Sequence, residues 1–319
     1  MNKLKGLFLR KTTLQGHKTM PLKRSVSIQC YLLLALPLIG FFVFTIYPII
    51  WAFLKAFFYY DKNPFNTRFV GIENFINVFT KDKSYWASWL TTFKIMFMKL
   101  PFEIPMALVF AVMLKNVSKK SGQFFRAVFT MPNVVSTAII GVIFTNMFDY
   151  FGFINELLIN LGILKEPFNW FGSTIGSLIA LCAGSLWSCI GVNILYFTAA
   201  LTNVPEDVYE AAEIDGANTF VKFFKITIPM IAPVFRTILL LAINGTIQGG
   251  EYIIAFTNGA PGGSTLTVGA YMIKAFLPGF ATGVPNVGYG CAAAIITSIL
   301  ATMVALIYQR VSIKMKEVY

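Results

Sequence analysis

Six long apolar segments constrain the fold of this chain more than any other feature of its sequence. A helix needs roughly 20 apolar residues to cross the hydrocarbon core of a bilayer, and each segment reaches that length. Backbone polar groups in lipid must bond within their own segment, so helices are expected. Only 13% of the 319 residues are charged, whereas soluble domains carry about a quarter. The sequence therefore predicts an all-α integral membrane protein with six transmembrane helices, at about 28–52, 89–114, 125–148, 176–201, 232–257 and 288–310.

Two of these segments contain residues that disturb a helix. The third contains Pro132 and Asn133, and proline both removes a backbone donor and clashes with the preceding turn. We expect the third and fifth segments to be kinked or tilted, the fifth because it carries Asn244, Gly245, Gln248, Gly249, Gly250 and Glu251.

The first segment is too long for the apolar part of a cleavable signal peptide, so it is expected to be an anchor.

Lysine and arginine indicate how the chain is oriented. An even number of spans places both termini on one side of the membrane. That side collects 17 basic residues, in the tail 1–27, between the second and third spans, before the fifth span and at the C-terminal end, against seven on the other side. The excess marks the cytoplasm, so the tails 1–27 and 311–319 are predicted to be cytoplasmic. The net charge of +12 is therefore a topology signal that needs no nucleic acid, although the basic N-terminal tail could also touch anionic lipid.

The sequence contains no pattern of residues that indicates catalysis. It lacks the Gly-rich, Lys-containing loop that holds nucleotide phosphates. Its single histidine is His17, and its acids and cysteines form no metal or nucleophile cluster. We therefore expect no catalytic, metal or cofactor-binding residues on this chain, and a function in moving a solute.

A polar segment at residues 203–231 interrupts the apolar pattern on the predicted cytoplasmic side. Pro205, followed by two acids, suits a first helical turn. The pair Asp215-Gly216 is expected to end that helix, and phenylalanines spaced three to four apart open a second one. Pro229 and Pro233 are expected to stop the motif where the next span begins. The residues alone leave open an ordinary amphipathic loop lying on the membrane.

This segment resembles the EAA loop of the membrane subunits of bacterial ABC importers. Ile228 stands where the family favours leucine. In that family the loop forms a coupling helix seated on a separate ATPase, which holds the ATP and magnesium. The resemblance implies as partners ATP-binding cassette subunits, a second permease subunit and an extracytoplasmic solute-binding protein. The residues that match and that would couple to the ATPase are Glu210, Ala211, Ala212, Asp215, Gly216, Ala217, Phe223 and Pro229, with Ile226 and Pro233 also matching.

Further segments resemble the carbohydrate branch of these permeases, the MalF- and UgpA-like proteins. Residues 70–93, 124–144, 151–172 and the signature TNGAPGGST at 257–265 are similar to that branch, whereas residues 1–25 are not covered. The resemblance implies a MetI-like fold of the type I importers, in a bacterial cell membrane, that passes a carbohydrate, most simply an oligosaccharide. A glycerol-phosphate or polyol substrate, and an ion-coupled secondary carrier working alone, remain as alternatives.

The resemblance also places the sugar path between the spans that flank the EAA loop. A sugar needs hydrogen-bonding partners and flat apolar faces. In one continuous helix Asn244, Gln248 and Glu251 would share a face. The alternative is that these residues only pack helices together, and Gly249-Gly250 replaces part of an Asn-rich run, so a site shared with or mostly on the partner subunit stays open. The candidate path residues are Trp187, Ser188, Asn193, Asn244, Thr246, Gln248 and Glu251.

Charged side chains inside the predicted spans need partners. Lys94, Lys99, Glu103 and Glu251 fall there, and each unpaired charge costs roughly 2.5 kcal/mol or more at the bilayer centre. Lys99 and Glu103 are four residues apart on one helix. We predict that they form a structural ion pair; a proton relay, as in a secondary carrier, is the alternative.

Overall fold

The structure is a computed structural model that describes residues 24–61, 63–115, 117–277, 279–281 and 286–314. Of the predicted cytoplasmic tails, residues 1–23 and 315–319 lie outside the described residues. The chain forms two compact units, an N-terminal unit (residues 1–51) and a main unit (residues 52–319). Among the described residues, five helices are long and apolar enough to cross a membrane, or six if one bent pair counts as a single span.

The N-terminal unit is one helical run that continues toward Lys55. It is α-helical at α1 (Arg24–Phe41) and α2 (Tyr47–Lys55), with a π-helical turn, η1 (Phe42–Ile46), between them. None of the side chains described at residues 29–51 is buried. The run Gln29–Lys55 qualifies as a span, and its exposed Leu, Ile and Phe side chains suit contact with lipid.

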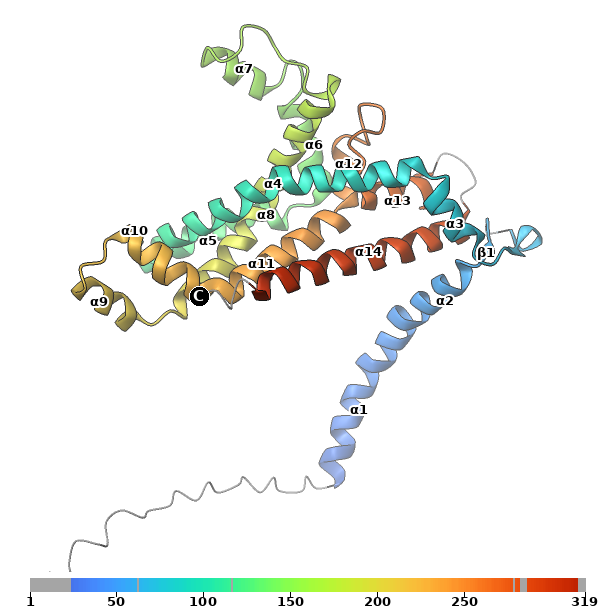
Figure 1. The fold of residues 1–319 in the computed structure, drawn as a ribbon, viewed down its shortest axis with the longest axis horizontal. Coiled ribbons are helices and arrows are strands. Elements are labelled where there is room, and N and C mark those ends of the chain that lie inside the picture. Colours follow the sequence, from blue (N-terminus) through green and yellow to red (C-terminus); the bar gives the residue numbers. More distant parts are fainter. Residues whose placement is uncertain (1–23, 62, 116, 278, 282–285, 315–319) are drawn as a thin grey trace, which may run out of the picture. The chain divides into compact units, whose positions relative to one another are not determined.

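The main unit is a helical bundle (Figure 1). The strands in its described part are a two-residue pair, β1 (Phe58–Tyr59) and β2 (Arg68–Phe69), with Phe58 opposite Phe69. The long helices of the bundle are α4 (Lys83–Lys115), α8 (Thr174–Thr202), α11 (Ile228–Gln248) and α14 (Val287–Lys314). The shorter elements are η2 (Pro64–Asn66), α3 (Glu73–Thr80), α5 (Lys119–Val134), α6 (Thr137–Met147), α7 (Phe153–Asn160), η3 (Trp170–Gly172), α9 (Glu206–Ile214), α10 (Thr219–Lys222), η4 (Phe223–Thr227), α12 (Gly250–Phe256) and α13 (Val268–Phe276).

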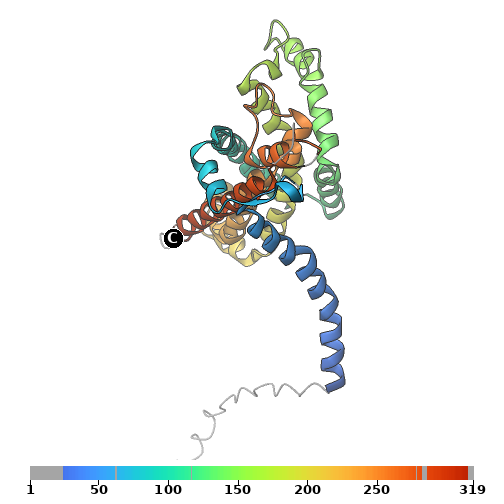
Figure 2. The same cartoon turned by 90° about the vertical axis from the view of Figure 1, so that its right-hand side faces the viewer.

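Three apolar clusters hold the bundle together. One joins α4, α8 and α11 through residues such as Leu108, Ile194 and Ile238. A second joins α6, α8 and α12, and a third joins α3, α4, α11, α13 and α14. α9 and α10 lie at one end of the bundle and α3 with β1 at the other (Figure 1), while α6 and α7 project from it in both views (Figure 2).

The third predicted span is bent as its sequence indicates. α5 and α6 meet at an angle of 95°, and the bend falls after Pro132, at the extended residue Val135. α5 lies against α8 at Gly191, where an added Cβ would collide with the carbonyl oxygen of Phe129. The bent span is therefore held by a close backbone approach to α8.

The fifth predicted span is also interrupted. α11 ends at Gln248, and Gly249 separates it from α12, which begins at Gly250. The interruption lies among the glycines that weakened this segment in the sequence. At its other end, helical structure begins at Thr219, well before the predicted start.

Two π-helical turns stand just before prolines. η1 ends two residues before Pro48, and η4 ends two residues before Pro229. In each turn the residue before proline donates its backbone N–H five residues back, from Tyr47 to Phe42 and from Ile228 to Phe223. Proline has no N–H and crowds the carbonyl four residues earlier, and a widened turn relieves that clash.

At the end opposite α9 and α10, a carboxylate ties three helices together. Asp82 stands before α4 and accepts a hydrogen bond from the backbone N–H of Tyr85 (2.9 Å). Its other oxygen accepts from the hydroxyls of Tyr271 on α13 (2.6 Å) and Tyr289 on α14 (2.9 Å). Burial, followed by this hydrogen bond, raises the pKa of Tyr271 above its ordinary value.

Candidate functional site

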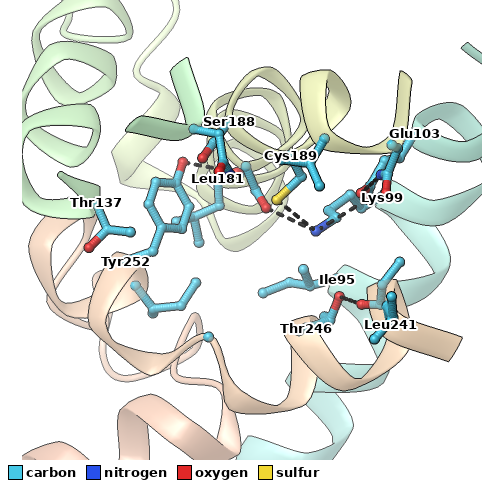
Figure 3. Close-up of a pocket in the computed structure, with 18 of the residues that line it drawn as sticks. Ile95, Lys99, Glu103, Thr137, Leu181, Ser188, Cys189, Leu241, Thr246 and Tyr252 are labelled. Atoms are coloured by element: carbon cyan, nitrogen blue, oxygen red, sulfur yellow. Dashed lines mark hydrogen bonds and ion pairs between the residues drawn. The ribbon is translucent and has the colours of Figure 1, made fainter. Parts of the chain in front are cut away.

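A cavity of about 370 Å³ lies between α4, α8 and the broken spans. Its wall is mostly apolar, with polar groups from several helices. Lys99 on α4 and Cys189 on α8 point toward one another across it, and Tyr252 and Thr246 face it from α12 and α11 (Figure 3). The remaining lining includes Ile95, Glu103, Asn133, Thr137, Leu181, Ser185, Ser188, Val192, Asn193, Tyr196, Leu241, Ala242, Gly245, Gly249, Ile253 and Thr267.

The predicted ion pair of α4 lies in this cavity. The ammonium nitrogen of Lys99 is 3.2 Å from Oε2 of Glu103, and the two side chains are only 5% and 1% exposed. Asn193 donates from Nδ2 to Oε1 of Glu103 (2.7 Å), and Lys99 donates to Oγ of Ser185 (3.1 Å). The pairing within one helix is as predicted, and the two further bonds connect it to α8. A buried charge pair is tolerated when its remaining hydrogen-bonding groups are satisfied in this way.

The structure brings some of the predicted path residues together and leaves others apart. Ser188, Asn193 and Thr246 line the cavity, and the hydroxyl of Thr246 donates to its own helix at Ala242 (2.9 Å). Trp187 does not line it, and its ring packs on Phe144 of α6 with centroids 5.7 Å apart. Asn244, Gln248 and Glu251 also lie outside the cavity lining.

The prediction that Asn244, Gln248 and Glu251 share one face of the fifth span is wrong beyond Gln248. It assumed one continuous helix, but α11 ends there, and Glu251 belongs to α12. Gly249 has ψ of 61°, far from the helical value. Gln248 and Glu251 are exposed in the chain alone, and Asn244 is half-buried.

Sequence reasoning missed several residues of the cavity. Ser185 and Tyr252 stand beside residues that were singled out, and the hydroxyl of Tyr252 donates to the carbonyl of Leu181 (3.1 Å). Cys189, one of four free cysteines, has its sulfur 4.0 Å from the Lys99 nitrogen. Asn133 and Thr137 enter because the third span bends there. The sequence feature that could have identified this part of the cavity is Asn133, a polar residue beside a proline inside a predicted span.

The second site is the loop between α8 and α11. The acids of its first turn, Glu206 and Asp207, stand where they meet the positive end of the α9 dipole. α9 ends at a glycine cap: Gly216 has φ of +78°, its N–H donates to Glu213, and Ala217 donates to Ala212 (3.0 and 2.8 Å). This pair of bonds is a Schellman motif, which needs a left-handed residue. The Asp-Gly-Ala pattern of the sequence therefore encodes the end of the helix.

Exposure divides the predicted coupling residues into two groups. Ala212 is buried, and Phe223 packs against the apolar cluster of α4, α8 and α11. The outward-facing surface adds three large apolar side chains that the sequence did not single out for coupling, namely Ile214, Phe220 and Phe224, which are 87%, 76% and 61% exposed. Glu210, Ala211, Asp215, Gly216 and Pro229 are also exposed, and Ala217 is half-buried.

The prolines do not end this loop, contrary to expectation. Asn218 caps α10 by accepting from the N–H of Val221 (2.9 Å). α10 then continues through η4 into α11, so that residues Thr219–Gln248 form one helical run. Pro229 lies in the first turn of α11, directly after the π-helical turn η4, and Pro233 stands inside the helix. The loop is thus joined to the next span without a break.

A hollow of about 580 Å³ separates α9 from the start of this helical run. Lys222 and Glu213 face each other across 3.3 Å, but Glu213 is 75% exposed, so the pair adds little stability. Within the described part of the chain, no group of three or more His, Cys, Asp or Glu side chains is placed to hold a metal. The geometry offers a surface and two hollows.

Long apolar helices around a small cavity that carries a few polar and charged groups, with a capped loop exposed at one end, are typical of a membrane transport subunit. Residues 103–317 match the family model described as "Binding-protein-dependent transport system inner membrane component". The chain belongs to this family of transport permeases, located in the inner membrane. The predicted membership of the binding-protein-dependent permease family is therefore confirmed.

The relatives and a solved structure agree with this assignment. The chain is 33% identical over 285 residues to the arabinooligosaccharides transport system permease protein AraP of Bacillus subtilis, covering 88% of both chains. It is 30% identical to the lactose transport system permease protein LacF of Rhizobium radiobacter, over 81% of this chain and 88% of that one. A bacterial ABC transporter involved in import of the acidic polysaccharide alginate has the same fold, with a TM-score of 0.77 at 20% identity, covering 91% and 96%. The predicted MetI-like importer fold is thus confirmed.

Proposed function

We propose that this chain is the permease subunit of an ATP-driven importer for a neutral oligosaccharide. It forms half of the translocation path, with both termini in the cytoplasm. A second permease subunit forms the other half, a solute-binding protein delivers the sugar, and a separate ATPase carries the ATP and magnesium. The chain itself is not an enzyme and binds no cofactor.

The observation that carries this proposal is the surface of the loop between α8 and α11. The loop exposes three large apolar side chains within eleven residues, namely Ile214, Phe220 and Phe224 at 87%, 76% and 61%, and several such side chains among polar neighbours favour a surface that a partner covers. The loop is capped at Gly216 and continuous with α11. A force applied to α9 therefore acts on a spanning helix, as coupling requires.

The chemistry of the cavity supports a neutral sugar. Its lysine is paired with its glutamate at 3.2 Å, so the wall presents no excess of positive charge for a phosphate. Hydroxyl and amide groups such as Ser188 and Asn193 suit sugar hydroxyls, and the rings of Tyr196 and Tyr252 offer flat faces. These features favour an oligosaccharide over glycerol phosphate.

The function is tested with the complete complex of both permeases and the ATPase in liposomes. We expect uptake of labelled arabinotriose, maltotriose or lactose when ATP is supplied on the side of the membrane where the ATPase lies and the binding protein is added on the opposite side. A proton or sodium gradient without ATP should drive none. Uptake by the purified chain alone under an ion gradient would identify a secondary carrier, and uptake of glycerol 3-phosphate in place of the sugars would refute the substrate.

The coupling surface is tested with point variants in the same complex. Glu210→Gln and Gly216→Ala should abolish ATP-coupled uptake and leave membrane insertion intact. Glu166→Gln, an exposed acid in the segment before η3, is the matched control for charge. Gly162→Ala is the matched control for backbone strain, because Gly162 follows α7 with φ of +72°. Normal uptake in the Glu210 and Gly216 variants would refute the coupling role.

A further inference from the structure

Tyr209 connects the coupling helix α9 to a helix that is distant in sequence. The ammonium nitrogen of Lys115, the last residue of α4, lies 4.3 Å from the centroid of the Tyr209 ring. A cation over the face of a tyrosine ring is attracted by the ring electrons. The ring also packs against the apolar cluster that contains Leu114 and Val204. Tyr209 is therefore held between the end of α4 and the bundle.

The hydroxyl of the same tyrosine makes a second connection. Tyr209 Oη and Thr227 Oγ1 are 2.9 Å apart, and Thr227 is only 5% exposed. Thr227 Oγ1 donates to the carbonyl of Lys222 (3.2 Å), so Tyr209 is the donor in the first bond. Thr227 is the last residue of the π-helical turn η4. Tyr209 thus bridges α4 and the turn from which α11 starts.

α4 extends this bridge to the cavity. The helix is unbroken from Lys83 to Lys115 and carries Lys99 and Glu103, which line the cavity. At 1.5 Å per residue, these side chains stand about 18–24 Å from Lys115 along the helix. α4 does not flank the coupling loop in the sequence, whereas α8 and α11 do. It offers a third mechanical connection between the cavity and the loop.

We propose that Tyr209 is a positioning residue for energy coupling: it fastens α4 and η4 to the coupling helix, so that occupancy of the cavity and nucleotide hydrolysis are linked through α4 as well as through the flanking spans. This proposal rests on the proposed coupling function of the loop. It assigns to Lys115, Tyr209 and Thr227 a role that the family motif does not include, because the motif begins at Glu210.

The test measures how many oligosaccharide molecules are imported per ATP hydrolysed by the reconstituted complex. Lys115→Met should lower this ratio about two- to five-fold, the range expected for an exposed cation–π contact, while Lys115→Arg keeps the cation and the ratio. Tyr209→Leu loses both connections and should lower it further. Tyr209→Phe keeps the ring and should match Thr227→Val. Lys120→Met, an exposed lysine at the start of α5, is the matched control and should leave the ratio unchanged.

A double variant separates this mechanism from general damage. If Lys115 acts through the Tyr209 ring, Lys115→Met combined with Tyr209→Leu should be no worse than Tyr209→Leu alone. Multiplied effects, or a normal ratio in Tyr209→Leu, would overturn the proposal. The Glu210→Gln complex distinguishes a failure of the role proposed for Tyr209 from a failure of the coupling function proposed for the loop. If it is uncoupled while the Tyr209 and Lys115 variants are normal, only this inference is wrong; if it also imports normally, the coupling function itself has failed.

Discussion

The loop between α8 and α11 and the cavity are built from contacts of very different range. In the loop, the cap of α9 joins residues three and five apart, and Asn218 caps a residue three positions away. In the cavity, Lys99 bonds to Ser185 across 86 positions, Glu103 to Asn193 across 90 and Tyr252 to Leu181 across 71. The helix caps of the loop are specified by its own sequence, whereas the cavity exists only when distant helices have packed.

The two regions also treat polarity in opposite ways. The cavity buries a charged pair and satisfies it from two helices. The loop leaves its acids in solvent and exposes apolar side chains such as Ile214 and Phe220. Burying charge costs several kcal/mol per ion unless partners are placed well, and exposing apolar area is costly unless a partner covers it. Each region therefore carries an energetic cost at the place where it acts.

The largest expected effect tests the long-range contacts of the cavity. Lys99→Met leaves Glu103 charged and buried, and breaking a buried pair in this way costs about 3–5 kcal/mol. We expect a clear fall in the thermal unfolding temperature of the purified complex in detergent. Lys94→Met, an exposed lysine of the same helix, should change it little. Lys99→Met combined with Glu103→Gln should recover most of the loss, and an unchanged unfolding temperature in the single variant would show that solvent in the cavity supports the charge.

The next effect tests the close packing that places the bent span. Gly191→Ala puts a Cβ against the carbonyl of Phe129, and overpacking of this kind costs about 1–3 kcal/mol. Gly245→Ala is the same substitution on a helix with open space around it, and alanine favours a helix by up to about 1 kcal/mol. The two variants should therefore shift the unfolding temperature in opposite directions. Equal shifts would mean that the contact between α5 and α8 yields freely.

The same difference in range explains what the sequence could predict. The apolar periods and lengths identify the spans, and Pro132 with Asn133 marks the bend of the third. In the loop, the break at Asp215-Gly216 and the acids of the first turn of α9 are local signals, so they were readable. The confirmed pairing of Lys99 with Glu103 was also local, because the two residues lie one turn apart on α4.

What could not be predicted depends on partners that are distant in sequence. Nothing near Ser185 or Cys189 shows that Lys99 will face them. The stripe of Asn244, Gln248 and Glu251 failed because a single backbone angle at Gly249 ends α11. The continuity past Pro229 was missed because proline is usually a stop, and the π-helical turn before it removes the clash.

A smaller effect tests whether the loop is locally encoded. Asn218→Ala removes the cap of α10, and such a change costs typically about 1 kcal/mol. We expect faster amide hydrogen exchange in residues 219–224 and no change in the helices around the cavity. Asn218→Asp supplies the same acceptor and should restore protection. Faster exchange throughout the bundle in Asn218→Ala would contradict local encoding, because the loop would then hold the distant helices in place.

The smallest effect extends the comparison to the carboxylate tie at the other end of the bundle. The folded pKa of Tyr271 is raised above its ordinary value of 10.0 by burial and by its hydrogen bond to Asp82. Below the ordinary pKa of 10.0 the Tyr271 hydroxyl is protonated in the folded and in the unfolded chain, and its full contribution to stability is present. Above pH 10.0 the unfolded chain loses this proton first, so the free energy of unfolding falls as pH rises. Tyr271→Phe loses the hydrogen bond but also this titration, so its deficit in unfolding temperature should narrow between about pH 8.5 and about pH 11. Tyr59→Phe, which removes the hydroxyl of a tyrosine of β1 whose ring stacks against the guanidinium of Arg68, should show no such narrowing. A deficit for Tyr271→Phe that stays constant with pH would mean that the Tyr271 hydroxyl is solvated well enough to ionise in the folded state. Long-range contacts would then exclude water from the cavity but not from this end of the bundle.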